Sequence, residues 1–477
     1  MRVRHLAIVS LVAVAVACAT NPATGRRQLI LMSEAEEISL GQKSDVEVRQ
    51  QMGLHEDPNV QRYIDNIGQR LARGSFRPNL KWTFAVVDEQ AVNAFALPGG
   101  YIYVTRGILP YMRNEAELSG VIGHEIGHVD GKHSVDQYSK QMLAGGALAA
   151  GSILAPKYST AFGAGGLLAN FVFLKYGRDA ELEADRLGVA YASKGGWAPA
   201  AMQGVLGTLG RIDAAQGSSR GIPNWALSHP PAVDRVEKVQ EAVDAARGYG
   251  GAATNEPAFE RIINGLVVGD SREKGMVRGS EFVHPVMRFS LNFPNGWEIT
   301  NGAAQVSAVP GEQGSAAMIL EISKSQGSPA QAAQQDMSQA KLQQTSGGGT
   351  RINGLDAYVG IYEGVSNNTR IVVRAAHIRS GNQTYLVAGL STPDAFSSAD
   401  RQFQQAIQSF RQLSAQEAER IQPSRLDFYT VRGGDSWDSL ARQSNGAVKA
   451  TSLAIMNGSE PGTAPRVGSR IRVVIGG

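Results

Sequence analysis

Two histidines spaced by one helical turn are the residues of this chain with the clearest potential for chemistry. They lie in the segment His124-Glu125-Ile126-Gly127-His128. In a helix, four positions correspond to about 40° around the axis and one turn along it, so both imidazoles can reach one metal ion. Glu125 then points beside them, where its carboxylate can take a proton from water instead of binding the metal. The alternative is a pair of helical histidines held only by structural hydrogen bonds, which requires a chance match among eight histidines.

The third ligand of such a site has to come from elsewhere, because a catalytic zinc ion needs three protein ligands and an open fourth position. His133 is near in sequence, but in a continuing helix it lies about 140° from His128 around the axis. A histidine six residues after His128 would indicate a different class of zinc peptidase, and that position is Ser134. We therefore expect His133 to support the site or the fold.

A downstream acidic segment offers better candidates. It reads Tyr176-Gly-Arg-Asp-Ala-Glu181-Leu-Glu183-Ala-Asp185. Glu181 and Asp185 are four residues apart and share one helix face, so one can bind the metal while the other accepts a hydrogen bond from a ligating imidazole. Glu183 is expected to point elsewhere. A solvated, charged helix face is the alternative interpretation of this segment alone.

The elements that must position these residues are predicted to be mostly helical over 33–245. Asn114, followed three residues later by Glu117, is typical of a helix N-cap with a capping box, and the helix that it opens runs through the histidine pair. Two short strands are expected between the helices, over 81–87 and 101–105.

These features together resemble a known family. The histidine pair with its intervening glutamate, followed by the segment Arg178–Asp185, is similar to metallopeptidase family forty-eight. That family consists of gluzincins and includes CAAX prenyl proteases and periplasmic BepA-like lipoproteins. The resemblance covers roughly residues 27–245 and includes His229-Pro230 and Arg235, and no role is assigned to Arg235.

The resemblance implies a catalytic centre with one Zn²⁺ per chain. The implied metal ligands are His124, His128 and Glu181. Glu125 would be the general base of peptide hydrolysis. Asp185 would orient a ligating histidine, and Arg178 would lie beside it behind the ligands.

The resemblance also places a substrate-side edge strand next to the centre. The segments Asn93–Gly100 and Thr105–Gly107 match those that precede and form this strand in the family. A strand over 101–105 can pair with an extended polypeptide through its backbone. The expected substrate-strand residues are Asn93, Tyr101, Tyr103 and Thr105. The transmembrane helices of the prenyl-protease branch are not expected here, which favours the periplasmic branch.

His229 is the remaining candidate for the active site. Pro230 favours an extended backbone before it, so His229 is expected on a loop. The resemblance gives it two alternative roles: a hydrogen-bond donor to the reaction's oxyanion, or a ligand in the fourth position of zinc while the enzyme is latent. A purely structural role is the third interpretation, since a second His-Pro dipeptide occurs at His284.

Two further domains are expected after a glycine-rich linker at 246–254. Strand and helix patterns mix over 256–415, which indicates an α+β domain, faintly similar to PsbP/Mog-like domains, to which we assign no chemistry. Residues 427–475 resemble a LysM module, whose family binds glycans such as peptidoglycan. Trp437 replaces the usual aliphatic residue there, and a module kept only for packing is the alternative.

The predicted fold class is therefore multidomain. A mainly α, zincin-like (gluzincin) metalloprotease domain with a small β-sheet occupies 33–245. The α+β domain and a small βααβ LysM-like module follow it.

The N-terminus carries the features of an export signal. Two arginines precede an apolar run that ends at Cys18, and about a dozen apolar residues suit a signal peptide over 1–17 rather than a membrane-spanning helix of about 20. The segment Ala15-Val-Ala-Cys18 resembles a bacterial lipobox, which implies a lipidated cysteine and a tether over 18–32. Ala19, the residue after this cysteine, resembles the sorting signal of lipoproteins of the outer membrane. An ordinary signal peptide is the alternative.

Composition narrows the function classes further. The chain has 477 residues, too many for one hydrophobic core. The chain has 46 Lys and Arg residues and 43 Asp and Glu residues, a net charge of +3. The resulting positive field is too weak to indicate nucleic acid as a partner. A single cysteine excludes an intramolecular disulfide framework and a cysteine-rich zinc site.

The predicted function is that of a zinc metalloendopeptidase, lipid-anchored in the bacterial periplasm at the outer membrane. Its substrates would be unfolded or misassembled envelope polypeptides, and residues 427–475 would contact peptidoglycan. The rival is a non-proteolytic assembly factor or scaffold with a zinc site. Glu125 favours the enzyme, because structural zinc takes four ligands and needs no adjacent base.

Overall fold

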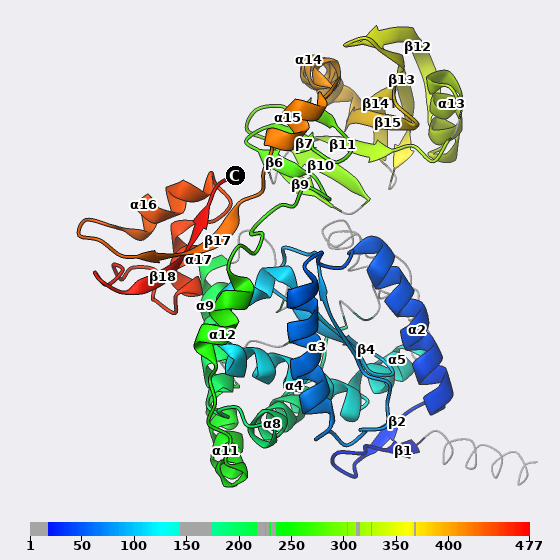
Figure 1. Ribbon diagram of the computed structural model, residues 1–477. Coiled ribbons are helices and arrows are strands. Elements are labelled where there is room, and N and C mark those ends of the chain that lie inside the picture. Colours follow the sequence, from blue (N-terminus) through cyan, green and yellow to red (C-terminus); the bar gives the residue numbers. More distant parts are fainter. Residues whose placement is uncertain are drawn as a thin grey trace, which may run out of the picture. The chain divides into compact units, whose positions relative to one another are not determined.

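The computed structural model of the chain forms two compact units, each described here by itself (Figure 1). It describes residues 18–143, 171, 174–216, 225, 229, 235–302, 304–311, 315–325, 327–366 and 369–477. Unit 1 contains the described residues up to Gly269 and the segment from Ser424 onwards, and unit 2 contains those from Asp270 to Pro423. The predicted signal peptide, 1–17, lies outside the described residues. No helix in the described ranges is long and apolar enough to cross a membrane.

Helices dominate the part of unit 1 that precedes Gly269. They are α2 (Glu34–Gln51), α3 (Pro58–Ala72), the 3₁₀-helix η1 (Arg106–Tyr111), α4 (Glu115–Asp130), α5 (His133–Leu143), α8 (Arg178–Lys194), α9 (Ala201–Gln216), α11 (Val236–Ala246), η3 (Arg247–Tyr249) and α12 (Glu256–Ile263). All residues of α4 are buried, because α3, α8, α9 and a small sheet pack around it. The histidine-bearing helix is therefore the centre of the unit.

The start of α4 follows the prediction only in part. Asn114 is the N-cap, and its side chain accepts a hydrogen bond from the backbone N–H of Glu117. The carboxylate of Glu117, however, accepts from the backbone N–H of Arg113 at 2.6 Å, one residue before the N-cap. The predicted capping box is thus replaced by an ion pair with Arg113.

Glycines let α4 and α8 approach each other closely. A Cβ atom on Gly188 would lie 2.7 Å from the backbone nitrogen of His124, and one on Gly127 would lie 2.9 Å from the Cα of Ala184. Real Cβ atoms do not come this near to backbone, so any side chain here would push the helices apart. The crossing brings the two chemically important segments side by side.

The small sheet corrects one sequence prediction. Its strands are β3 (Thr83–Val87), β4 (Ala94–Leu97) and β5 (Tyr101–Thr105), in the order β3-β5-β4. β5 pairs in parallel with β3 and antiparallel with β4, so both of its backbone edges are used. The strand over 101–105 is therefore central, and β4 is an edge strand of the sheet.

The segment predicted as a tether contains a small hairpin. β1 (Cys18–Thr20) pairs antiparallel with β2 (Arg27–Leu29), and the turn between them begins at the buried Asn21. The backbone N–H of Leu29 donates to Asp136 of α5 at 3.2 Å. The hairpin is thus packed on unit 1.

Unit 2 mixes strands and helices, as the α+β prediction requires. A seven-stranded antiparallel sheet has the order β12-β13-β14-β15-β11-β10-β9, and a four-stranded sheet has the order β16-β8-β7-β6. The strands are β6 (Met276–Arg278), β7 (Glu281–His284), β8 (Phe289–Asn292), β9 (Glu298–Asn301), β10 (Gln305–Val309), β11 (Ala316–Ile322), β12 (Gln343–Ile352), β13 (Leu355–Ser366), β14 (Thr369–Ser380), β15 (Gln383–Ser391) and β16 (Arg411–Gln412), and the helices are α13 (Pro329–Gln339), α14 (Pro393–Ser409) and α15 (Ala415–Arg420).

The boundary of this unit differs from the predicted one at residue 256. Phe259 and Ile263 of α12 are fully buried in the hydrophobic core of unit 1. The helix was assigned to the second domain because it follows the glycine-rich segment, whereas its apolar face packs back on α3 and α4.

The C-terminal segment has the predicted order strand, helix, helix, strand. Its elements are β17 (Arg425–Thr430), α16 (Trp437–Ala441), η4 (Arg442–Ser444), α17 (Ala450–Met456) and β18 (Arg470–Ile475). It is not separate from the helical part of unit 1, since Leu440 and Leu453 lie in the same hydrophobic core. The guanidinium of the buried Arg472 donates to the backbone oxygen of Arg113 at 3.0 Å.

Candidate metal centre

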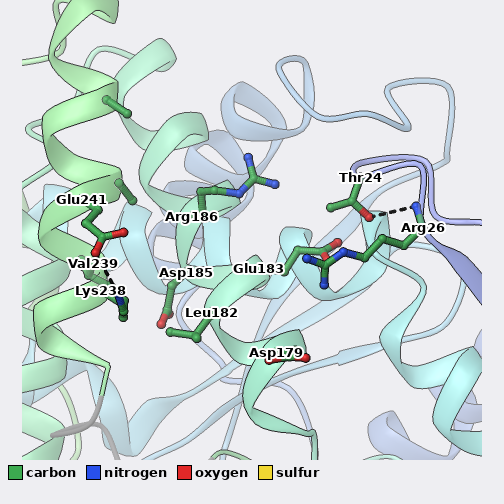
Figure 2. A pocket seen from close by; sticks show the side chains of 12 residues that line it. Thr24, Arg26, Asp179, Leu182, Glu183, Asp185, Arg186, Lys238, Val239 and Glu241 are labelled. Atoms are coloured by element: carbon green, nitrogen blue, oxygen red, sulfur yellow. Dashed lines mark hydrogen bonds and ion pairs between the residues drawn. The ribbon is translucent and has the colours of Figure 1, made fainter.

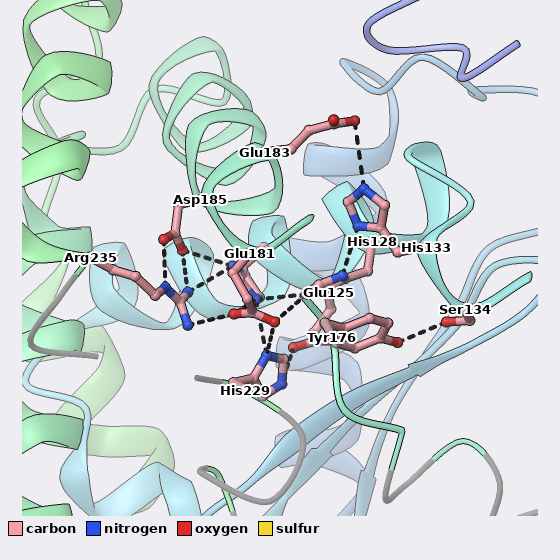
Figure 3. Close-up of polar contacts among 11 residues, drawn as sticks. Glu125, His128, His133, Ser134, Tyr176, Glu181, Glu183, Asp185, His229 and Arg235 are labelled. Carbon is pink, nitrogen blue, oxygen red and sulfur yellow. Dashed lines mark hydrogen bonds and ion pairs between the residues drawn. The ribbon is translucent and has the colours of Figure 1, made fainter. Parts of the chain in front are cut away.

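Four side chains converge where α4 crosses α8. His124, His128, Glu181 and His229 each offer one ligand atom, and these atoms all lie within 4.8 Å of one another. Figure 3 shows His128, Glu181 and His229 around this point. All four residues are buried. The first two come from α4, Glu181 comes from the first turn of α8, and His229 comes from outside both helices. The structure thus brings together the ligand set named from the sequence.

The outer nitrogens of the two α4 histidines are already engaged. Nδ1 of His124 lies 2.9 Å from Asp185 Oδ1, and Nδ1 of His128 lies 2.9 Å from Nδ1 of His133. Their Nε2 atoms face each other at 3.0 Å. With each Nδ1 occupied, Nε2 is the atom that each imidazole presents to the shared point, which is the arrangement of metal-binding histidines.

Glu181 faces the same point and is held as a carboxylate. Its Oε1 lies 2.9 Å from His229 Nδ1, and its Oε2 lies 2.5 Å from Nη1 of Arg235. Burial raises the pKa of Glu181, but its interactions with His229, Arg235 and His128 outweigh burial and hold this pKa well below its usual value. An ionised oxygen donor therefore faces the imidazoles.

Asp185 is fixed by an arginine, but not by the one that the sequence pointed to. Nε of Arg235, the N-cap residue of α11, donates to Asp185 Oδ2 at 2.7 Å. Both residues are 1% exposed. Arg178 begins α8 and is exposed, so it does not lie behind the ligands. Arg235 takes the position predicted for Arg178, because α11, the helix that it begins, packs on α8.

Glu125 stands apart from the other polar groups of the centre. It is fully buried, and neither carboxylate oxygen has a hydrogen-bond partner among the described residues. Its Oε1 lies 3.8 Å from Nε2 of His229. Burial is the main cause that raises the pKa of Glu125 above its ordinary value. A buried carboxylate without partners is costly, and such a group is expected where water or substrate completes it.

The donor set suits a divalent transition metal. Burial lowers the pKa of His128 well below its usual value, so this imidazole is neutral, the form that binds metals. Nitrogen donors with one carboxylate match zinc, and hydrogen-bonded carboxylates behind the imidazoles match the surroundings of zinc ligands. The residues present therefore fit the ion that the sequence implied.

Comparison with known proteins identifies the family. The pattern of peptidase family M48 matches residues 58–243. The metalloprotease YcaL of Escherichia coli is 30% identical over 188 residues, which cover 38% of this chain and 71% of that protein. The chain belongs to peptidase family M48.

Two other relatives of this M48 protein align over a smaller share of their length than YcaL does. The putative beta-barrel assembly-enhancing protease of Vibrio cholerae is 32% identical over 193 residues, 39% of each chain. The beta-barrel assembly-enhancing protease of Escherichia coli is 30% identical over 241 residues, 48% of each chain. The chain thus spans about half or less of the length of these two relatives.

One solved structure shows a weak likeness to the M48 protein. The solution structure of cyanobacterial PsbP from Synechocystis shares 12% identity with it and covers 29% of this chain and 94% of that one, with a TM-score of 0.24. A TM-score this low carries no conclusion about the fold.

Two aromatic rings line the M48 centre. Tyr176 stacks on His128 with ring centroids 3.9 Å apart, and its hydroxyl lies 2.8 Å from Ser134 Oγ. Trp225 stacks on His229 with centroids 4.0 Å apart. Stacked rings fix the planes of both imidazoles. Neither contact was foreseen, because sequence spacing carries no signal for these long-range pairs.

The predicted substrate-strand residues serve the sheet itself. The hydroxyl of Thr105 donates to the backbone oxygen of Asn93 at 2.6 Å, and that of Tyr103 donates to Asp45 of α2. Tyr101 is half-buried at the start of β5. Because β5 is the central strand, both of its backbone edges are already paired, so a substrate strand over 101–105 is not supported. The edge strand of this sheet is β4, which packs on α4.

Proposed function

We propose that this chain is a zinc-dependent metalloendopeptidase. The observation that carries the proposal is Glu125: a buried carboxylate with two unpartnered oxygens directly beside two histidines and a glutamate whose ligand atoms converge. Structural zinc sites use four protein ligands and need no free carboxylate. Family membership supports the same conclusion.

The residues divide the chemistry among themselves. His124, His128 and Glu181 would hold the ion. Bound zinc supplies a Lewis acid that polarises a peptide carbonyl and lowers the pKa of water. Glu125 takes the proton of the attacking water and passes it to the leaving nitrogen. Asp185 keeps the proton of His124 on Nδ1, so that Nε2 remains free to ligate.

His229 is proposed as a latent ligand. Its Nδ1 lies 2.9 Å from Glu181 Oε1 and 3.4 Å from His124 Nε2, inside the group of ligand atoms. An oxyanion donor has to direct an N–H at the reacting carbonyl oxygen, whereas Nδ1 of His229 is directed at Glu181. This placement supports the role of a latent zinc ligand over that of an oxyanion donor. Trp225 stacks on the His229 ring and holds it in this position.

Extended polypeptides are the proposed substrates. β4 pairs on one side with β5, and no other described strand pairs with it, so its free backbone edge can take a substrate strand. Backbone pairing is independent of side chains, which favours unfolded or misassembled chains. The names of the Vibrio and Escherichia relatives, which refer to beta-barrel assembly, support an envelope quality-control role in the periplasm.

Attachment to the envelope completes the proposal. Cys18 would carry a lipid that inserts in the outer membrane. Residues 427–475 would contact peptidoglycan, which is favoured by their βααβ order and by their resemblance to a LysM module. This segment shares the core of unit 1, so its deletion would also damage the peptidase. Sedimentation of the full chain with peptidoglycan is therefore the suitable measurement.

Substitution of the proposed base tests the function. Glu125→Gln should retain one zinc per chain and lose about 10²–10⁴-fold in casein cleavage, because the ligands remain and the base is removed. Glu237→Gln, at an exposed position on α11, is the matched control and should cleave normally. Wild-type cleavage should stop with a chelator and return with zinc. A wild-type chain that binds zinc but cleaves nothing would instead support the scaffold.

A further inference from the structure

The N-terminal hairpin reaches the metal centre through one buried side chain. Asn21 is 1% exposed. Its Oδ1 accepts hydrogen bonds from the backbone N–H groups of Ala23 at 2.8 Å and Thr24 at 3.1 Å, which form the turn between β1 and β2. The amide oxygen is therefore committed to the turn, and the amide nitrogen has to point towards unit 1.

That nitrogen donates to a carboxylate of α8. Asn21 Nδ2 lies 2.7 Å from Glu183 Oε1 and 3.4 Å from the backbone oxygen of Gly131, the residue that ends α4. Gln28 of the same hairpin donates to the same Gly131 oxygen at 2.7 Å. Two amides thus dock the hairpin on the end of α4, but only Asn21 reaches Glu183.

Glu183 in turn faces His133, and His133 faces a metal ligand. Glu183 Oε1 lies 3.6 Å from His133 Nε2, and Nδ1 of His133 lies 2.9 Å from Nδ1 of His128. If His128 binds through Nε2, its Nδ1 carries a proton and donates it to His133. His133 then keeps its own proton on Nε2, which faces Glu183.

The two ligating histidines are therefore supported by carboxylates of the same helix in different ways. Asp185 contacts His124 directly, whereas Glu183 acts on His128 through one intervening imidazole. The longer route extends beyond α8 to the hairpin. The sequence prediction that Glu183 points elsewhere is correct only in that it does not face the ligands.

We propose that Asn21 is a positioning residue for His128, acting through Glu183 and His133. It holds the carboxylate where that group can fix the tautomer and the ring of His133, and hence the orientation of the ligand. This inference rests on the proposed zinc function. It adds that metal affinity depends on a residue three positions after Cys18.

A cavity beside this chain of contacts makes a conservative test feasible. It has a volume of about 420 Å³ and is lined by side chains of the hairpin turn, α8 and α11, including Thr24, Arg26, Glu183 and Lys238 (Figure 2). Water in this cavity can replace a small missing donor. A substitution that only removes the amide donor of Asn21 should therefore disturb Glu183 less than one that places an acceptor opposite it.

Asn21→Asp is the sharpest variant. Its carboxylate can still accept the two turn hydrogen bonds, but an oxygen now faces Glu183 in place of the donor. Loss of a group that supports a metal ligand costs about 10–100-fold in affinity, so the zinc dissociation constant should rise about 10-fold in chelator competition on the full chain. Gln28→Glu also replaces an amide with a carboxylate, but at the contact with Gly131, which does not involve Glu183 or His133. Its zinc affinity should stay within about twofold of wild type.

A second substitution that restores zinc affinity would distinguish a positioning role of Asn21 from general damage to the fold. In Asn21→Asp combined with Glu183→Gln, the new glutamine can donate to Asp and accept from His133, so affinity should recover in part. If Asn21→Asp does not fold, Asn21→Ser keeps an acceptor for the turn but lacks the reach to Glu183. Its zinc affinity should fall by less than that expected for Asn21→Asp and should still lie below that of Gln28→Glu. Unchanged zinc affinity, or equal loss in Gln28→Glu, would overturn the inference. A wild-type chain without zinc affinity would instead refute the proposed function.

Discussion

Nδ1 of His229 lies 2.9 Å from Oε1 of Glu181, closer than either α4 histidine comes to that carboxylate. His229 thus lies inside the group of candidate ligand atoms. The alternative roles of this histidine now make opposite predictions for one variant.

His229→Ala should raise basal casein cleavage while zinc content stays near one per chain, because His124, His128 and Glu181 remain. An oxyanion donor would give the reverse, a loss of about 10²–10³-fold in turnover. Cleavage and bound zinc measured on the same preparation decide between them. Unchanged values for both would leave His229 a structural residue.

Removal of Glu181 and of Asp185 should have unequal effects on the metal. Glu181→Ala loses a ligand, whereas Asp185→Asn loses only the support of His124, which costs about 10–100-fold in affinity. Zinc content after dialysis against a weak chelator should therefore fall further for Glu181→Ala. The opposite ranking would exchange the two roles.

The crossing of α4 and α8 is predicted to tolerate no side chain at Gly188. In Gly188→Ala the new Cβ would approach the His124 backbone to 2.7 Å, and overpacking of this kind costs about 1–3 kcal/mol. Thermal unfolding should show the loss, and zinc affinity should fall with it, since His124 shifts away from Asp185. Gly210→Ala on α9 is the control: its Cβ meets nothing within 4 Å, so it should stabilise the helix by about 0.5–1 kcal/mol. Equal effects at both sites would contradict the close crossing.

His284 should make unit 2 sensitive to acid. Burial lowers the pKa of His284 to about 4, and its Nδ1 accepts from the backbone of Met287. Above pH 6.5 the imidazole is neutral in both states. Below it the unfolded chain binds the proton first, so stability is lost as pH falls from about 6.5 to about 4, by about 3 kcal/mol in all.

Hydrogen exchange in the full chain measures this effect. Protection of β7 and β8 should fall over that range in the wild type, relative to His284→Asn measured at each pH. Asparagine can still accept from Met287 but does not titrate there. Parallel pH profiles for the two proteins would show that His284 is not the group responsible.

The sequence was most informative where chemistry depends on local spacing. His124, Glu125 and His128 lie on one helix, and Glu181 and Asp185 share one face of another, so a period of 3.6 residues was sufficient to group them. The N-cap at Asn114 followed from the same local rules.

What remained hidden depends on contacts between distant segments. Arg235 and Asn21 reach α8 from 50 and 162 residues away, and no periodicity encodes that. Central and edge strands show the same alternation, so the position of β5 between β3 and β4 was not visible either. Arg178 was named because it begins the segment that resembles the family, but in the first turn of α8 it is exposed.

The topology of unit 1 has a consequence for the timing of its assembly. Leu266 and Leu426 are joined by a backbone hydrogen bond of 2.8 Å, although all of unit 2 separates them along the chain. The core around α4 includes Leu453 and Val473, which are synthesised more than 300 residues after His128. A chain made from its N-terminus therefore carries its whole catalytic segment before it has the residues that complete the surrounding core. Unit 1 can therefore complete its core only after unit 2 and the segment up to β18 have been synthesised.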